Sequence, residues 1–112
     1  MSESSAPSAS IVLSTAGSPE EAARISRELV ERGLAACVNR IPGLTSVYRW
    51  QGAIEEASEV LLVIKTSSEK LAALEAALHE LHSYDVPEFL VLPVAGGSRS
   101  YLDWLFASVA RE

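Results

Sequence analysis

The chain has little cysteine and little aromatic content: Cys37 is its single cysteine, and aromatic residues make up 6% of 112 residues. One cysteine excludes an internal disulfide and any CxxC metal or redox pair, which favours a reducing compartment. No apolar run is longer than residues 60–64, far short of the roughly 18 residues of a membrane span. We therefore expect a cytoplasmic protein without membrane association.

Basic residues are also few. Nine Lys and Arg against fifteen Asp and Glu give a net charge of −6 and a pI near 4.9, which repels nucleic acid and mildly favours cations. A 48% hydrophobic share is too high for a disordered chain. Residues 1–9 carry neither a basic cluster nor an apolar stretch, so we predict a disordered leader there and a single domain over residues 10–112.

Periodicity and turn residues predict seven elements. In chain order these are a strand at 11–15, a helix from Pro19 to Gly33, strands at 34–50 and 53–66, a helix from Ser67 or Ser68 to near Ser83, a strand at 89–94, and a helix from about Ser100. Ser18 and Glu21 form a capping box for the first helix, and Ser100 with Asp103 is expected to cap the last. Pro42-Gly43 predicts a β-bulge, and Gln51-Gly52 a tight hairpin turn.

This order predicts an α+β fold, a βαββαβ sandwich of four antiparallel strands with two helices on one face, a long β-hairpin and an extra C-terminal helix. Residues 60–64 are apolar at odd and at even positions, and successive side chains of a strand point to opposite faces, so the sheet face away from the two helices is apolar as well. We expect a homo-oligomer to cover that face. The alternative is that the C-terminal helix folds over it.

Several motifs, in order over residues 11–107, closely resemble the CutA divalent-cation tolerance proteins. They are Leu34-Ala35-Ala36-Cys37-Val38-Asn39, Ser46-x-Tyr48-x-Trp50-x-Gly52-x-Ile54, Glu59-Val60-Leu61-Leu62-x-Ile64-Lys65-Thr66, His82-x-Tyr84-x-Val86-Pro87-Glu88 and Tyr101-Leu102-Asp103-Trp104. The resemblance implies a ferredoxin-like protomer in a tight homotrimer that binds or senses divalent metal ions such as copper or zinc, with no metal required for folding. It also implies similarity to PII signalling trimers, which bind small effectors between subunits.

Candidate metal ligands lie at and just after the end of the second predicted helix, and a further one, Cys37, lies in the predicted strand at 34–50. His82 is the first candidate, followed by Cys37, Glu88 and Asp85, because imidazole, thiolate and carboxylate together suit Cu²⁺ or Zn²⁺. His79 lies three residues before His82 on the same flank. Each of these residues also has a structural interpretation, as a solvated surface group or, for Cys37, an inert buried residue.

The copper site described for some bacterial relatives uses a cysteine on the first strand and two adjacent histidines. In this chain Ser14 and Leu81 stand at two of those three positions, and only His82 is in register. A hydroxyl is a poor ligand for soft metals. We therefore expect any metal site to be weak, assisted by carboxylates, or shared between subunits.

A second candidate site is an effector cleft between subunits, lined by Tyr48, Trp50, Lys65 and Tyr84. In this interpretation Lys65 binds an anionic effector, and metals are involved only indirectly; the alternative for Lys65 is a strand-end side chain that reaches solvent. Catalysis is not expected. Only Gly17 could begin a phosphate-binding loop after the first strand, no basic residue precedes Arg24, and there is no G-x-S-x-G motif.

Overall fold

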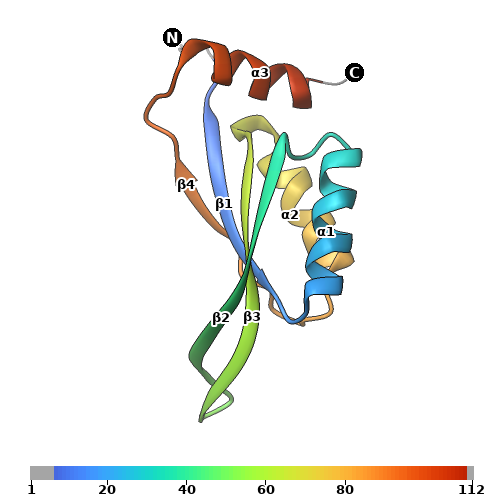
Figure 1. Ribbon diagram of the computed structural model, residues 1–112, viewed down its shortest axis with the longest axis vertical. Coiled ribbons are helices and arrows are strands. Elements are labelled where there is room, and N and C mark those ends of the chain that lie inside the picture. The colour runs from blue at the N-terminus through green and yellow to red at the C-terminus, as the bar shows by residue number, and fades with distance from the viewer. Residues whose placement is uncertain (1–6, 111–112) are drawn as a thin grey trace.

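The structure, a computed structural model, describes residues 7–110 and confirms the βαββαβα order (Figure 1). The elements are β1 (Ala9–Ala16), α1 (Pro19–Glu31), β2 (Cys37–Trp50), β3 (Ala53–Ser67), the 3-10 turn η1 (Ser68–Lys70), α2 (Leu71–Leu81), β4 (Leu90–Pro93) and α3 (Arg99–Val109). β1 begins at Ala9, which is buried, so the folded domain starts one residue before the predicted boundary. Most of the predicted leader, residues 1–6, lies outside the described residues.

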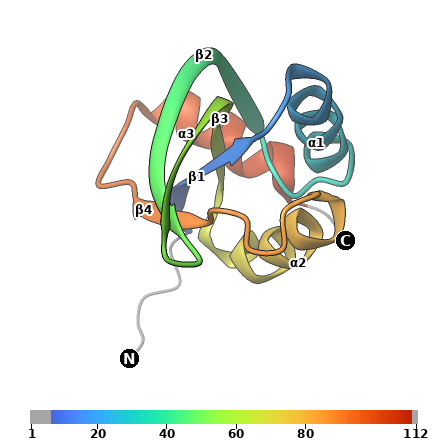
Figure 2. The same cartoon turned by 90° about the horizontal axis from the view of Figure 1, so that it is seen from below.

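The four strands form one antiparallel sheet in the order β2-β3-β1-β4. Helices α1 and α2 lie side by side on one face of it (Figure 2). Even-numbered residues of β1 and β3, such as Val12, Leu62 and Ile64, are fully buried against these helices. Each fully buried aliphatic side chain of this kind contributes about 1.5–3 kcal/mol. This layer is the main core, and it contains Ile25 and Leu29 of α1 as well as residues of α2.

The other face of the sheet, which we call the open face, carries the odd-numbered residues of the same strands. They are Ile11 and Leu13 of β1, Leu61 and Val63 of β3, and, at the neighbouring edge, Leu92 of β4; Leu13 lies opposite Val63, and Ile11 opposite Leu92. The first four are only partly buried, and Leu92 is 47% exposed. The open face is thus an apolar surface that α1 and α2 leave uncovered.

Helix α3 covers only one end of the open face. It crosses the upper ends of β1, β2 and β3 (Figure 1), where Leu105 and Val109 are buried with Ala9 and Ala36 in a second small cluster. The alternative in which the C-terminal helix folds over the open face therefore holds for this end of the face alone. The rest of the apolar surface is available to another subunit.

The β2-β3 hairpin extends well beyond the end of β1 and forms an arm (Figure 1), which gives the molecule its 47 Å length against widths of 29 and 25 Å. β1 ends opposite Val60, so residues 44–59 have no third strand beside them. The arm closes at Gln51-Gly52, the predicted tight turn, and both residues have positive φ, as a type I′ turn requires.

The predicted bulge lies at Pro42-Gly43. Between the pairs Ile41↔Leu61 and Leu44↔Glu59, β2 has one residue more than β3. Gly43 has φ +84°, a conformation that glycine adopts without the penalty of a side chain. A one-residue insertion exchanges the two faces of the strand beyond it, so the bulge turns Ser46, Tyr48 and Trp50 toward the side of Glu59.

Three predicted helix boundaries need correction. Neither Ser67 nor Ser68 caps the second helix, because the chain passes through η1 first and the Ser68 hydroxyl bonds Ser8 and Ser10. That helix ends at Leu81. The N-cap of α3 is Ser98, whose hydroxyl accepts from the Tyr101 amide, and not Ser100. No helix within residues 7–110 is long and apolar enough to cross a membrane.

Candidate functional site

A groove of about 670 Å³ lies where the hairpin arm meets the segment between α2 and β4. The arm provides one wall and residues 84–88 provide the other. The lining residues are Thr15, Ser46, Val47, Tyr48, Trp50, Glu59, Tyr84, Asp85, Val86, Pro87 and Glu88. The groove therefore joins parts of the chain that are up to 73 positions apart, through the pairing of β1 with β3.

Glu59 lies at the base of the groove, with only 8% of its surface exposed. Its Oε1 accepts a hydrogen bond from the Ser46 hydroxyl at 2.6 Å, and its Oε2 accepts one from the Tyr84 phenol at 2.7 Å. These bonds hold the carboxylate but do not neutralise it, since Glu59 forms no ion pair with any Lys, Arg or His of residues 7–110. A buried carboxylate without a counter-ion attracts a cation.

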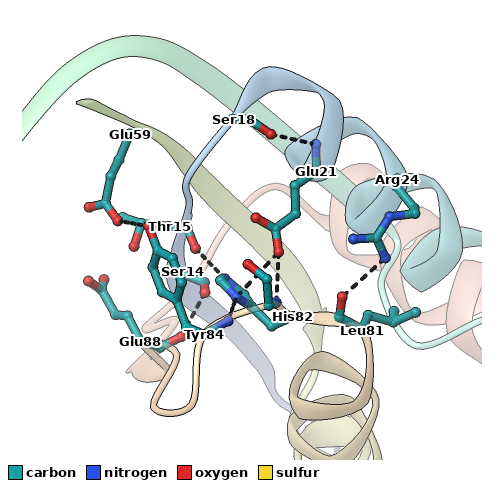
Figure 3. Close-up of polar contacts among 11 residues, drawn as sticks. Ser14, Thr15, Ser18, Glu21, Arg24, Glu59, Leu81, His82, Tyr84 and Glu88 are labelled. Atoms are coloured by element: carbon teal, nitrogen blue, oxygen red, sulfur yellow. Dashed lines mark hydrogen bonds and ion pairs between the residues drawn. The ribbon is translucent and has the colours of Figure 1, made fainter. Parts of the chain in front are cut away.

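Tyr84 joins the two walls. Burial raises the pKa of its phenol well above the ordinary value of 10.0, and the hydrogen bond to Glu59 adds to this, so the phenol remains a neutral donor (Figure 3). The backbone of Gly17 lies close to the same ring: a Cβ there would meet the Tyr84 oxygen at 3.1 Å. The absence of a side chain at Gly17 therefore gives the phenol room to reach Glu59.

Glu88 forms the other acidic part of the groove. Burial raises the pKa of its carboxyl, and the nearby negative charge of Glu59 raises it further. The Glu88 backbone is held by β1, because the hydroxyl of the fully buried Ser14 donates to the Glu88 carbonyl at 2.7 Å (Figure 3). Ser14, at the position of the cysteine in the copper site described above, is here a hydrogen-bond donor that positions this wall.

His82 is the C-cap residue of α2, and its side chain is completely buried. Its Nε2 is 2.6 Å from the Thr15 carbonyl, to which it donates, and its Nδ1 accepts from the Tyr84 amide at 3.1 Å. This assigns the neutral Nε2–H tautomer. Both ring nitrogens are thus occupied, so His82 can bind a metal ion only if one of these hydrogen bonds breaks.

Glu21 supports this turn from α1. Burial acts to raise the pKa of its carboxyl, but the hydrogen bonds that it accepts from the backbone and side chain of Ser83 act in the opposite direction, and the pKa lies below the ordinary value. Its Oε2 accepts from the Ser83 amide at 2.8 Å and lies 3.6 Å from His82 Nδ1 (Figure 3). The first turn of α1 and the end of α2 therefore hold the 82–84 segment in place.

The structure brings together some of the predicted site residues and separates others. The groove is lined by three residues of the predicted effector cleft, Tyr48, Trp50 and Tyr84. It is also lined by two of the predicted metal ligands, Asp85 and Glu88. Three other predicted residues are not part of its lining. His82 is buried, and Cys37 pairs with Lys65 at the opposite end of β2, where the Lys65 ammonium is 5.9 Å from the centre of the Tyr101 ring. In the described part of the chain no three His, Cys, Asp or Glu side chains are placed to hold one metal ion.

Sequence reasoning missed Glu59 and Ser46 as site residues. The sequence did contain a signal for Glu59, because it is an acidic residue directly before the apolar run at 60–64. Like Leu61 and Val63, it is an odd-numbered residue of β3 and therefore lies on the side of the open face. Its contact with Tyr84, 25 positions away, follows from no local pattern.

Replacing Glu88 by glutamine is expected to change the pH dependence of stability. Because the folded-state pKa of Glu88 is raised, the native protein binds this proton more tightly than the unfolded chain does. The contribution of Glu88 to wild-type stability therefore falls as the pH rises from 4.5, the ordinary value, through the raised pKa. Glu88→Gln cannot ionise, so above that range it should unfold at a slightly higher temperature than the wild type.

Thermal denaturation between about pH 4 and about pH 8 measures this difference. Glu75→Gln, on the exposed surface of α2, is the matched control and should follow the wild-type curve. A Glu88→Gln protein less stable than the wild type near neutral pH would contradict the expectation.

Comparison with known proteins places the whole domain in one family. The family model described as CutA1 divalent ion tolerance protein matches residues 10–108. The "Divalent-cation tolerance protein CutA" of Thermus thermophilus is 52% identical over 95 residues, which are 85% of this chain and 92% of that protein.

Solved structures agree with the sequence matches. The Cut A1 protein of Thermus thermophilus superposes with a TM-score of 0.89 at 48% identity, over 91% of this chain and 99% of that one. The CutA of Archaeoglobus fulgidus, described as a periplasmic divalent cation tolerance protein, gives a TM-score of 0.87 at 40% identity, over 90% of this chain and 98% of that one.

Proposed function

Because the chain belongs to the CutA1 divalent ion tolerance protein family, we propose that it acts in tolerance to divalent cations as a homotrimer that binds these ions, copper and zinc among them, without catalysis. The observation that carries the proposal is the groove around Glu59: a buried carboxylate, two further carboxylates at Asp85 and Glu88, and no basic side chain in the lining. Such a site lowers the energy of a bound cation.

The homotrimer is supported by the open face. Its apolar residues continue from β1 and β3 to the edges of the sheet, where Ile41 is 48% and Leu90 is 58% exposed. Apolar patches of this extent on a small domain mark protein interfaces. A cyclic assembly of three copies would cover the three open faces and place each groove near a second subunit.

Metal ligands are proposed to be shared between subunits. Glu59, Asp85 and Glu88 of one protomer all line the groove. Within residues 7–110, however, no three such side chains are close enough together to bind the same metal ion. A soft copper site of thiolate and imidazole does not fit these residues, since Ser14 donates to Glu88 and both nitrogens of His82 are bonded. We propose weak, carboxylate-assisted binding, with His82 and Cys37 as ligands only where a second subunit or a local rearrangement exposes them.

Calorimetric titration with Cu²⁺ and Zn²⁺ tests this function. The wild type should bind with saturable heats, and Glu59→Gln, which keeps the size and removes the charge, should lower the affinity about tenfold, equivalent to ~1.4 kcal/mol. Glu75→Gln is the control and should bind as the wild type does. Absence of any binding below roughly millimolar ion would reject metal binding, and equal affinities for Glu59→Gln and wild type would remove the groove as its site.

The location of the protein stays a prediction. A single cysteine favours a reducing compartment such as the cytoplasm, whereas the Archaeoglobus relative is described as periplasmic. Fractionation of cells of the source organism, followed by immunoblotting, distinguishes these locations.

A further inference from the structure

The groove carries negatively charged side chains that no basic residue of its lining balances. Glu59, Asp85 and Glu88 line it, and the lining contains no Lys, Arg or His. Lys65, the predicted partner for an anionic effector, lies at the other end of the sheet beside Tyr101. The ligand that complements this groove is therefore positively charged.

Aromatic rings line the groove beside the carboxylates. Tyr48 and Trp50 are two residues apart beyond the bulge, so both side chains leave β2 on the side of Glu59, and each is 42% exposed. Tyr84 adds a third ring, which joins the walls through its bond to Glu59. Faces of Trp and Tyr rings attract organic cations through their quadrupoles, and their apolar surface packs against alkyl groups.

Rings and carboxylates together select a class of cation. An inorganic divalent ion needs several oxygen, nitrogen or sulfur ligands around it, which residues 7–110 of one chain do not provide. An organic ammonium ion is more weakly hydrated and is bound by one carboxylate and aromatic faces. We propose that the groove binds an organic ammonium ion, its nitrogen between Glu59 and Glu88 and its alkyl groups against Tyr48 and Trp50.

This inference shares one premise with the proposed function, namely that the groove binds a cation. It does not require that a metal ion binds there. The volume of about 670 Å³ is within the range of small-molecule pockets. Tyr84 and Ser46 keep the Glu59 carboxylate oriented before a ligand arrives, so binding does not have to order it.

Choline and its neutral carbon analogue, dimethylbutanol, separate charge recognition from burial of an apolar group, because the two molecules have the same shape. Their binding to the full chain is measured by ligand-observed NMR in phosphate buffer free of metal and of amines. Choline should bind at least tenfold more tightly than the alcohol, a difference of ~1.4 kcal/mol or more. Equal binding of the two, or no binding of choline, overturns the inference.

Variants locate the site. Trp50→Leu and Glu59→Gln should each weaken choline binding about tenfold or more. Trp104→Leu, which removes a similarly exposed Trp from α3 and not from the groove, should leave choline binding unchanged. If Trp50→Leu alters the assembly, Tyr48→Leu provides the same test at a second ring. Retention of wild-type affinity in both ring variants overturns the inference.

Titration of the same preparations with Zn²⁺ in a non-coordinating buffer keeps the two proposals apart. Zn²⁺ binding without choline binding rejects the ammonium site and leaves the proposed function intact. Choline binding without Zn²⁺ binding supports the ammonium site and rejects the metal-binding part of the proposed function.

Discussion

Val63→Asp should convert the proposed homotrimer into a folded monomer. Val63 is in the middle of the open face, between Leu13 of β1 and Asn39 of β2, and it is only partly buried within one chain. In the lone protomer a carboxylate there still reaches water, so the fold persists. In the trimer three such carboxylates would be buried against apolar side chains, at a cost of several kcal/mol each.

Sedimentation equilibrium at micromolar concentration measures the mass, and far-ultraviolet circular dichroism verifies the fold. Val30→Asp is the matched control: it is the same substitution at a 44% exposed residue of α1, on the helical side of the molecule, and it should leave a trimer. A wild type that sediments as a stable monomer would refute the homotrimer. A trimeric Val63→Asp protein would show that the subunits do not meet through the open face.

His82→Ala is expected to lower the free energy of unfolding by about 3 kcal/mol. The substitution leaves the buried Thr15 carbonyl without its donor, removes the acceptor of the Tyr84 amide, and opens a cavity beneath the groove. Urea denaturation in the presence of a chelator measures the loss. The exposed residue His79 of α2 provides the control, since His79→Ala should change stability by less than about 0.5 kcal/mol.

The same experiment distinguishes a positioning role of His82 from a role as a metal ligand. A histidine that only binds metal contributes nothing in a chelator, so His82→Ala would then be as stable as the wild type. A positioning histidine is needed without any ion, and its loss should also weaken choline binding, because residues 82–84 carry Tyr84 to Glu59. Wild-type stability together with lost metal binding would restore the interpretation of His82 as a ligand.

The local features of the fold were predictable because they depend on neighbouring residues. Ser18 caps α1 and its hydroxyl accepts from the Glu21 amide, as the capping box requires. The bulge at Pro42-Gly43 and the turn at Gln51-Gly52 also lie where the sequence placed them. The N-cap of α3 was misplaced by two residues, since Ser98 and Ser100 are both suitable caps and only the path of the chain after β4 favours the first.

The groove itself was predictable only in part. The alternation of Ser46, Tyr48 and Trp50 indicated that their side chains share one side of a strand, which the register confirms. The same alternation could not show what faces them. Their neighbours Thr15, Glu59 and Tyr84 come from three other segments, and the sequence contains no spacing that relates them.

By itself, then, the sequence determined the family, the order of elements and the apolar character of both faces of the sheet. It also determined the excess of acidic residues, which favours a cationic ligand. Each of these properties follows from composition or from residues near one another in the chain. Only the tertiary structure decided that Glu59 is the buried charge of the groove, that Lys65 and Cys37 lie away from it, and that Ser14 and His82 position the wall beside it. Those roles depend on hydrogen bonds between residues 25 to 74 positions apart, which exist only once the strands have paired and the helices have packed.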